Sequence, residues 1–64
     1  MFYAVVETLL GNIGLVHDTF IVEEEANLYA SNHPKDVTIM SLTEAQVRAI
    51  EDNGGYIEEG TLNQ

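Results

Sequence analysis

The chain opens with two runs of β-branched and aromatic residues that a short polar segment separates. The first run spans residues 2–10 and the second spans residues 15–22, with Gly11–Gly14 between them. Glycine and asparagine between two such runs are typical of a β-hairpin. A helix over residues 4–10 is the alternative, and the β-branched residues of that segment disfavour it.

A short helix and a third strand are predicted to follow the hairpin. Residues 23–32 begin with three glutamates, which suit the positive end of a helix dipole, and Ala26 and Tyr29 open an apolar stripe at helical spacing. Pro34 ends this helix, because the residue before a proline is driven away from helical angles. Residues 36–42, which include Val37, Ile39 and Met40, are predicted to form a third strand.

A second helix is predicted from its end signals. Thr43 and Gln46 have the spacing of a capping box, and Glu44 precedes Arg48 by four residues, the favourable order for an ion pair on a helix. The glycines of residues 53–55 end the helix. Two apolar residues after them can add a short edge strand.

The predicted order is therefore strand, strand, helix, strand, helix, with a possible last strand at residues 56–57. This order indicates one α+β domain over residues 1–59 and a frayed polar tail at 60–64. A crossover through the first helix places the third strand beside the first, which gives the sheet order 2-1-3 with three to four strands. We expect both helices on one face of this sheet.

The predicted strands are apolar on both sides, although a sheet covered on one face should be polar on the other. We therefore expect an exposed apolar face that binds a partner protein, formed by Tyr3, Val5, His17 and Ile21. A second copy of the chain, in a homodimer, is the alternative cover for that face.

Charge narrows the class of partner. The 64 residues hold 11 Asp and Glu against two Lys and Arg, which gives a formal net charge of -9. Such a chain lacks the cations that direct binding to nucleic acid or anionic lipid requires, and it favours basic partners. A solvated surface that only keeps a small protein soluble is the alternative. The carboxylates expected to bind the partner are Glu23, Glu24, Glu25, Glu51, Asp52, Glu58 and Glu59.

Little in the sequence points to catalysis. Cysteine is absent, Ser31 and Ser41 lack the surroundings of a nucleophile, and no zinc-ligand spacing connects His17 with His33. We therefore predict no enzyme, no metal site and no cofactor. No apolar run approaches a membrane span and the N-terminus lacks the features of a signal peptide, so the expected location is the cytoplasm.

Two resemblances accompany these observations. Residues Ser41–Glu59 resemble the closing strand–helix–strand of subtilisin-propeptide inhibitor domains over under a third of the chain, whereas the first half has a hairpin where that family has a strand and then a helix. In size, acidity and absence of cysteine, the chain is similar to phage-encoded proteins that block host nucleic-acid enzymes, some of them by imitating the charge of DNA.

The sequence leads to one functional expectation and two alternatives. We expect a non-enzymatic acidic binding module that inhibits or adapts a basic protein that handles nucleic acid. The resemblance to propeptide inhibitor domains implies a protease-inhibitor-like domain instead, which would bind through its last strand. A self-assembling structural protein is the other alternative, and it would form a stable dimer or larger species.

Overall fold

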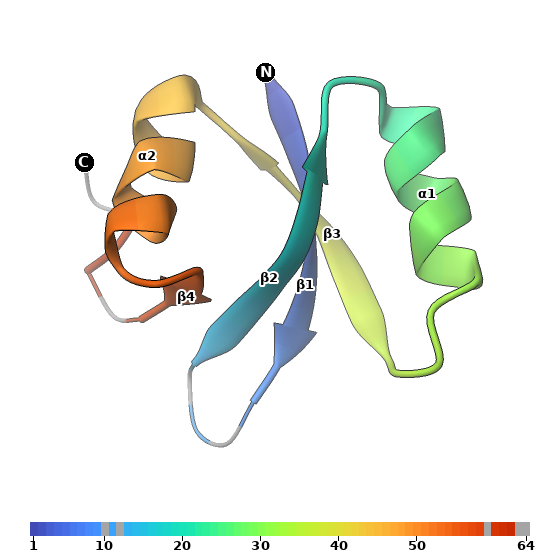
Figure 1. Cartoon of the computed structure of the whole chain (residues 1–64), viewed down its shortest axis with the longest axis horizontal. Coiled ribbons are helices and arrows are strands. Elements are labelled where there is room, and N and C mark those ends of the chain that lie inside the picture. The colour runs from blue at the N-terminus through green and yellow to red at the C-terminus, as the bar shows by residue number, and fades with distance from the viewer. Residues whose placement is uncertain (10, 12, 59, 63–64) are drawn as a thin grey trace.

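The computed structural model of the chain describes residues 1–9, 11, 13–58 and 60–62, and within them the elements follow the predicted order. They are β1 (Phe2–Thr8), β2 (Gly14–Phe20), α1 (Glu23–Ser31), β3 (Val37–Leu42), α2 (Glu44–Asp52) and β4 (Tyr56–Ile57). The α+β class is confirmed, with the four strands in one curled sheet (Figure 1).

The strand order confirms the predicted 2-1-3 arrangement. The sheet runs β3-β1-β2-β4, and each neighbouring pair is antiparallel. The predicted hairpin joins β1 to β2, where the Leu9 N–H donates to the Ile13 carbonyl at 2.7 Å. Residues 10 and 12 of its loop lie outside the described residues. The last strand, β4, extends the sheet beyond β2.

The predicted start of α2 is also confirmed. The Gln46 N–H donates to the Thr43 hydroxyl at 3.2 Å, and the Thr43 N–H donates to the Gln46 side-chain oxygen at 2.9 Å. These two bonds form the capping box. One turn further on, Arg48 pairs with Glu44 at 2.7 Å.

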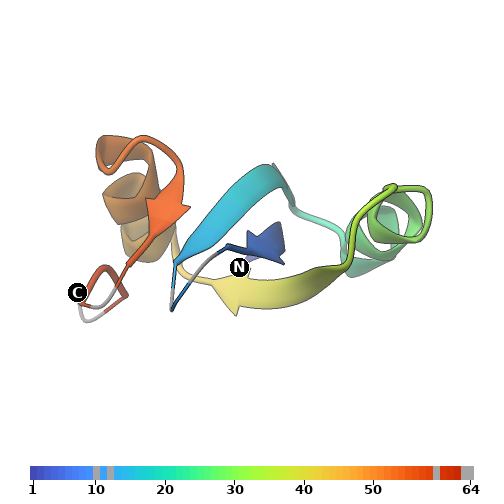
Figure 2. The same cartoon turned by 90° about the horizontal axis from the view of Figure 1, so that it is seen from below.

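The two helices lie on opposite sides of the sheet, which corrects the expectation that both cover one face (Figures 1 and 2). Ala4 and Val6 of β1 join Val47 and Ile50 of α2 in one buried cluster. Val5, which points the other way, is 0% exposed and lies outside that cluster. Since α1 packs on β1, β2 and β3 and buries its own Ala26, it covers the second face. The strands are apolar on both sides because both faces are covered.

A β-bulge in β2 changes which side chains reach each face. Val5 pairs with Asp18 but Val6 pairs with Val16, so His17 is an extra residue in the ladder. An extra residue shifts the alternation by one position. The residues that follow it up to Phe20 therefore point to the opposite face from the one that simple alternation predicts.

The end of the chain is docked as far as residue 62, whereas the sequence led us to expect a frayed tail from residue 60. Leu62 packs against the buried cluster, and its carbonyl accepts a bond from the Gln46 side-chain amide at 3.3 Å. The Glu58 N–H donates to the Thr61 hydroxyl at 3.0 Å. Residues 63–64 lie outside the described residues.

Candidate functional site

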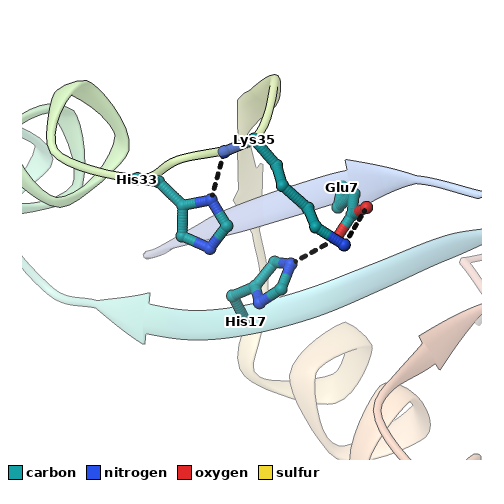
Figure 3. A network of polar contacts seen from close by, with 4 residues as sticks. All are labelled: Glu7, His17, His33 and Lys35. Carbon is teal, nitrogen blue, oxygen red and sulfur yellow. Dashed lines mark hydrogen bonds and ion pairs between the residues drawn. The ribbon is translucent and has the colours of Figure 1, made fainter.

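A polar cluster and an adjoining cleft lie on the side of the sheet that α1 covers. The cluster consists of Glu7 of β1, His17 of β2, and His33 and Lys35 of the segment between α1 and β3, and we call it the Glu7 cluster (Figure 3). Leu15 pairs with Glu7 and His17 lies two residues further along β2, so alternation points His17 to the same side of the sheet as Glu7. The α1–β3 segment brings His33 and Lys35 over the two strands.

Glu7 is the centre of this cluster. His17 Nε2 donates to Glu7 Oε1 at 2.8 Å, and Lys35 Nζ lies 3.5 Å from Glu7 Oε2. The Glu7 side chain is 15% exposed, whereas the other described Asp and Glu residues are exposed. One carboxylate thus ties together three segments of the chain.

The surroundings of Glu7 favour its ionised form. The hydrogen bond from His17 is the main reason that the pKa of Glu7 lies below its ordinary value, and Lys35 acts in the same direction, while burial acts against both. Glu7 is therefore an anion that holds His17 and Lys35 in place. A general acid would require the opposite shift.

His17 and His33 are in contact, although no spacing in the sequence connects them. Their ring centroids are 4.4 Å apart with planes inclined at 56°. His33 Nδ1 accepts a bond from the Lys35 N–H at 3.2 Å, so the proton of its neutral ring is on Nε2. His17 carries a proton on its own Nε2, which donates to Glu7. Both rings therefore have a fixed orientation.

An aromatic row continues from the Glu7 cluster toward the end of β2. Tyr29 lies 5.8 Å from His33 and 5.5 Å from Phe20, measured between ring centroids. These separations are typical of interacting aromatic pairs. Phe20 can take part because the bulge turns it toward α1.

The row forms one wall of a cleft between α1 and the end of β2, which we call the α1 cleft. Its volume is about 500 Å³, within the range of small-ligand pockets. The lining residues are Phe20, Glu25, Leu28, Tyr29, Asn32, His33 and Pro34. Leu28 is 66% exposed, so the cleft has an apolar wall that faces solvent. The charged side chain in the lining is the carboxylate of Glu25.

The apolar residues predicted to form an exposed face do not do so. Val5 is fully buried, and Tyr3 and His17 are half-buried. Ile21 is 75% exposed, but it lies between β2 and α1, outside the sheet. The expectation was wrong because it put both helices on one face and left the other bare.

Within the described residues, the predicted acidic side chains are exposed but do not form one surface. Glu23, Glu24 and Glu25 make up the first turn of α1, whereas Glu51 and Asp52 end α2. The two helices lie on opposite sides of the sheet (Figure 1). Glu58 follows β4 and accepts a bond from the Asn53 side chain at 3.2 Å. Glu59 lies outside the described residues.

The Glu7 cluster is the part of the site that the sequence analysis missed. Its signal was the position of Glu7 and His17 at similar distances on either side of the Gly11–Gly14 loop, with Glu7 the charged residue of the first apolar run. A hairpin brings such residues together. The position of His33 depends on how α1 lies on the sheet, which has no comparable signal in the sequence.

Three further findings concern metal binding, membrane-spanning helices and similarity to known proteins. In the part of the chain that the structure describes, no three His, Cys, Asp or Glu residues are grouped so that they could hold a metal ion. Neither helix in those residues is long and apolar enough to cross a membrane. No family model matches the chain, and no match is found among curated proteins or solved structures.

Proposed function

We propose that this protein is a non-enzymatic acidic binding module that engages the basic surface of a protein that handles nucleic acid, and inhibits or adapts it. The observation that carries the proposal is the use of the two fixed cations. Lys35 pairs with Glu7 and Arg48 pairs with Glu44, so both are neutralised within the chain. The other carboxylates supply the net charge of -9.

The first turn of α1 is the best supported contact surface. Glu23, Glu24 and Glu25 are exposed, and within the described residues no cation lies at ion-pair distance from them. Ile21 and Val22, directly before them, are 75% and 48% exposed. Negative charge beside exposed apolar side chains can both attract a basic surface and pack against it. We call residues 21–25 the α1 end.

Distance limits what the acidic residues can do together. The longest dimension of the molecule is 29 Å, and charges in physiological salt are screened beyond about 8 Å. The first turn of α1 and the last turn of α2 therefore act on separate parts of a partner. The proposal assigns binding to the α1 end and a general attractive effect to Glu51 and Asp52. It also includes the cytoplasmic location that the sequence suggests.

The test is a binding assay with a panel of purified basic DNA- and RNA-binding domains. Lysozyme, a basic protein that does not handle nucleic acid, serves as the reference. We expect saturable binding of at least one domain, displacement by duplex DNA, and an affinity that falls about tenfold or more between about 50 and about 300 mM NaCl. Binding no tighter than to lysozyme, or unaffected by salt, contradicts the proposal.

Matched variants locate the surface. The triple variant Glu23→Gln, Glu24→Gln, Glu25→Gln removes charge from the α1 end, and Glu51→Gln with Asp52→Asn removes it from the end of α2. We expect the first to weaken binding about tenfold and the second about threefold or less, because rim charges act mainly through long-range attraction. Circular dichroism checks that both variants stay folded. If both variants weakened binding equally, the contact would not lie at the α1 end in particular.

A further inference from the structure

We infer that the α1 cleft is the pocket for an arginine side chain of the basic partner. This inference rests on the proposed function and names the group that the site recognises. The cleft is bounded by the rings of Phe20 and Tyr29 and by the exposed side chain of Leu28, and Glu25 supplies a carboxylate in the same lining. Glu25 also belongs to the α1 end, so the cleft adjoins the acidic surface.

The chemistry of the lining fits a guanidinium group. A planar guanidinium stacks on an aromatic face and forms two parallel hydrogen bonds with a carboxylate, while the methylenes behind it pack on apolar surface. Phe20, Tyr29 and Leu28 offer apolar and aromatic contact, and Glu25 offers the carboxylate. The side-chain oxygen of Asn32, also in the lining, can accept a further N–H bond.

The charge of the molecule selects a cation over a neutral or acidic group. Glu23 and Glu24 directly precede Glu25 in the first turn of α1, and their charges add to the negative potential at the cleft. His33 Nδ1 already accepts the Lys35 N–H, so the side-chain acceptors in the lining are the oxygens of Glu25, Asn32 and Tyr29, of which Glu25 alone carries a charge. An ammonium group is a strongly hydrated point charge that gains less from aromatic stacking, so arginine should bind better than lysine.

The experiment compares an octa-arginine peptide with an octa-lysine peptide, each carrying a fluorescent label, by anisotropy at low salt. In a second measurement, the unlabelled peptides are added to the protein, and nuclear magnetic resonance follows the ring protons of its Phe20 and Tyr29. We expect octa-arginine to bind at least about threefold tighter than octa-lysine, because only the guanidinium stacks and pairs in two bonds. The ring protons of both residues should shift on titration with octa-arginine.

Glu25→Gln tests the carboxylate, with Glu24→Gln as its matched control. Both changes remove one charge from the same helical turn, but Glu24 does not line the cleft. We expect Glu25→Gln to weaken octa-arginine about fivefold and Glu24→Gln less than about twofold. Leu28→Ala, at an exposed side chain, should weaken octa-arginine without changing the fold.

The outcomes separate this inference from the proposed function. Equal affinities of the two peptides, or equal effects of Glu25→Gln and Glu24→Gln, would overturn the arginine pocket and leave the acidic binding module intact. Failure of both peptides to bind at low salt would overturn both. Shifts of the Phe20 and Tyr29 ring protons that follow protein concentration instead of added peptide would assign the cleft to a second copy of the chain and also overturn the inference.

Discussion

At the scale of single residues, the Glu7 side chain connects β1 to two other parts of the chain. It lies in the central strand of the β3-β1-β2 group, and its two oxygens engage His17 and Lys35. Lys35 also connects through its backbone to His33, so one carboxylate fixes the orientation of the segment between α1 and β3. That segment supplies His33 to the aromatic row and Asn32, His33 and Pro34 to the lining of the α1 cleft. Glu7 should therefore matter for the stability of the fold and for the shape of the α1 cleft.

We predict that Glu7→Gln lowers the urea midpoint of unfolding at neutral pH. The amide can still accept a bond from His17, but it has no charge to attract Lys35. Glu44→Gln is the matched control, because it removes one carboxylate from the exposed pair with Arg48. Exposed pairs contribute little, so the control should change the midpoint less. A larger loss with Glu44→Gln would contradict this role for Glu7.

The pH dependence of stability follows from the lowered pKa of Glu7. Its pKa in the folded chain lies below the ordinary value of 4.5. Above the ordinary value both states are ionised, and the stabilisation is fully present. As the pH falls below it, the unfolded chain binds the proton first, so stability is lost until the folded pKa is passed. The difference in urea midpoint between wild type and Glu7→Gln should therefore shrink as the pH falls below the ordinary value of 4.5. A difference that grows in acid would be inconsistent with the lowered pKa.

At the scale of the elements, local signals predicted the fold well. The capping box of Thr43 and Gln46 needs two residues three positions apart, and the structure has both bonds. Gly11–Gly14 and Pro34 likewise act on their immediate neighbours, so the hairpin and the end of α1 were predictable. The order 2-1-3 followed from these elements together with the rules for crossovers.

The features that the sequence did not predict depend on pairing between distant segments. The bulge at His17 arises from how β2 pairs with β1, and strict alternation therefore assigned Phe20 to the wrong face. The side on which α1 lies decides whether Val5 is exposed or buried, and the narrow apolar stripe of that helix did not decide it. The α1 cleft depends on both features, so it could not be predicted.

We predict that Thr43→Ala destabilises the fold by about 1 kcal/mol, because α2 loses its N-cap. In a domain of this size such a loss lowers the melting temperature by roughly 4–8 °C. The capping box also holds Gln46, whose amide binds the Leu62 carbonyl, so the docked end of the chain should loosen as well. Thr43→Ser keeps the hydroxyl and should change the melting temperature little. Circular dichroism on heating measures both, and equal losses would show that the methyl group matters instead of the hydroxyl.

At the scale of the whole molecule, apolar burial stabilises the inside of the fold, whereas the charge that attracts a partner lies on its surface. Apolar burial is internal, because α2 covers one face of the sheet and α1 covers the other. Charge is external, since the described carboxylates other than Glu7 are exposed. A partner therefore meets an acidic surface with few large apolar side chains, which in the described residues are Met1, Ile13, Ile21, Val22, Leu28 and Tyr56. Three of these, Ile21, Val22 and Leu28, lie in α1 or directly before it, beside the carboxylates of its first turn, which is why the α1 end and its cleft carry the proposal.

The excess charge should also make the stability of the molecule depend on salt. At about 10 mM salt the screening length is about 30 Å, comparable with the longest dimension of 29 Å. All the carboxylates then repel one another, and this repulsion destabilises the compact state. At about 150 mM the screening length falls to about 8 Å, which removes most repulsion between the two ends. Salt also weakens the Lys35–Glu7 and Arg48–Glu44 pairs, but among the described residues more carboxylates lack a Lys or Arg partner than have one.

We therefore predict that the urea midpoint at pH 7 rises with NaCl between about 10 and about 150 mM and changes less above that range. The variant Glu51→Gln with Asp52→Asn supplies the control, because it removes two charges that also face the negative end of the α2 dipole. This variant should have a higher urea midpoint than wild type at low salt, and its midpoint should change less as salt is added. A midpoint that falls as salt is added would mean that the two ion pairs outweigh the repulsion. The acidic residues would then be part of what holds the molecule together, with less of their charge free to act on a partner.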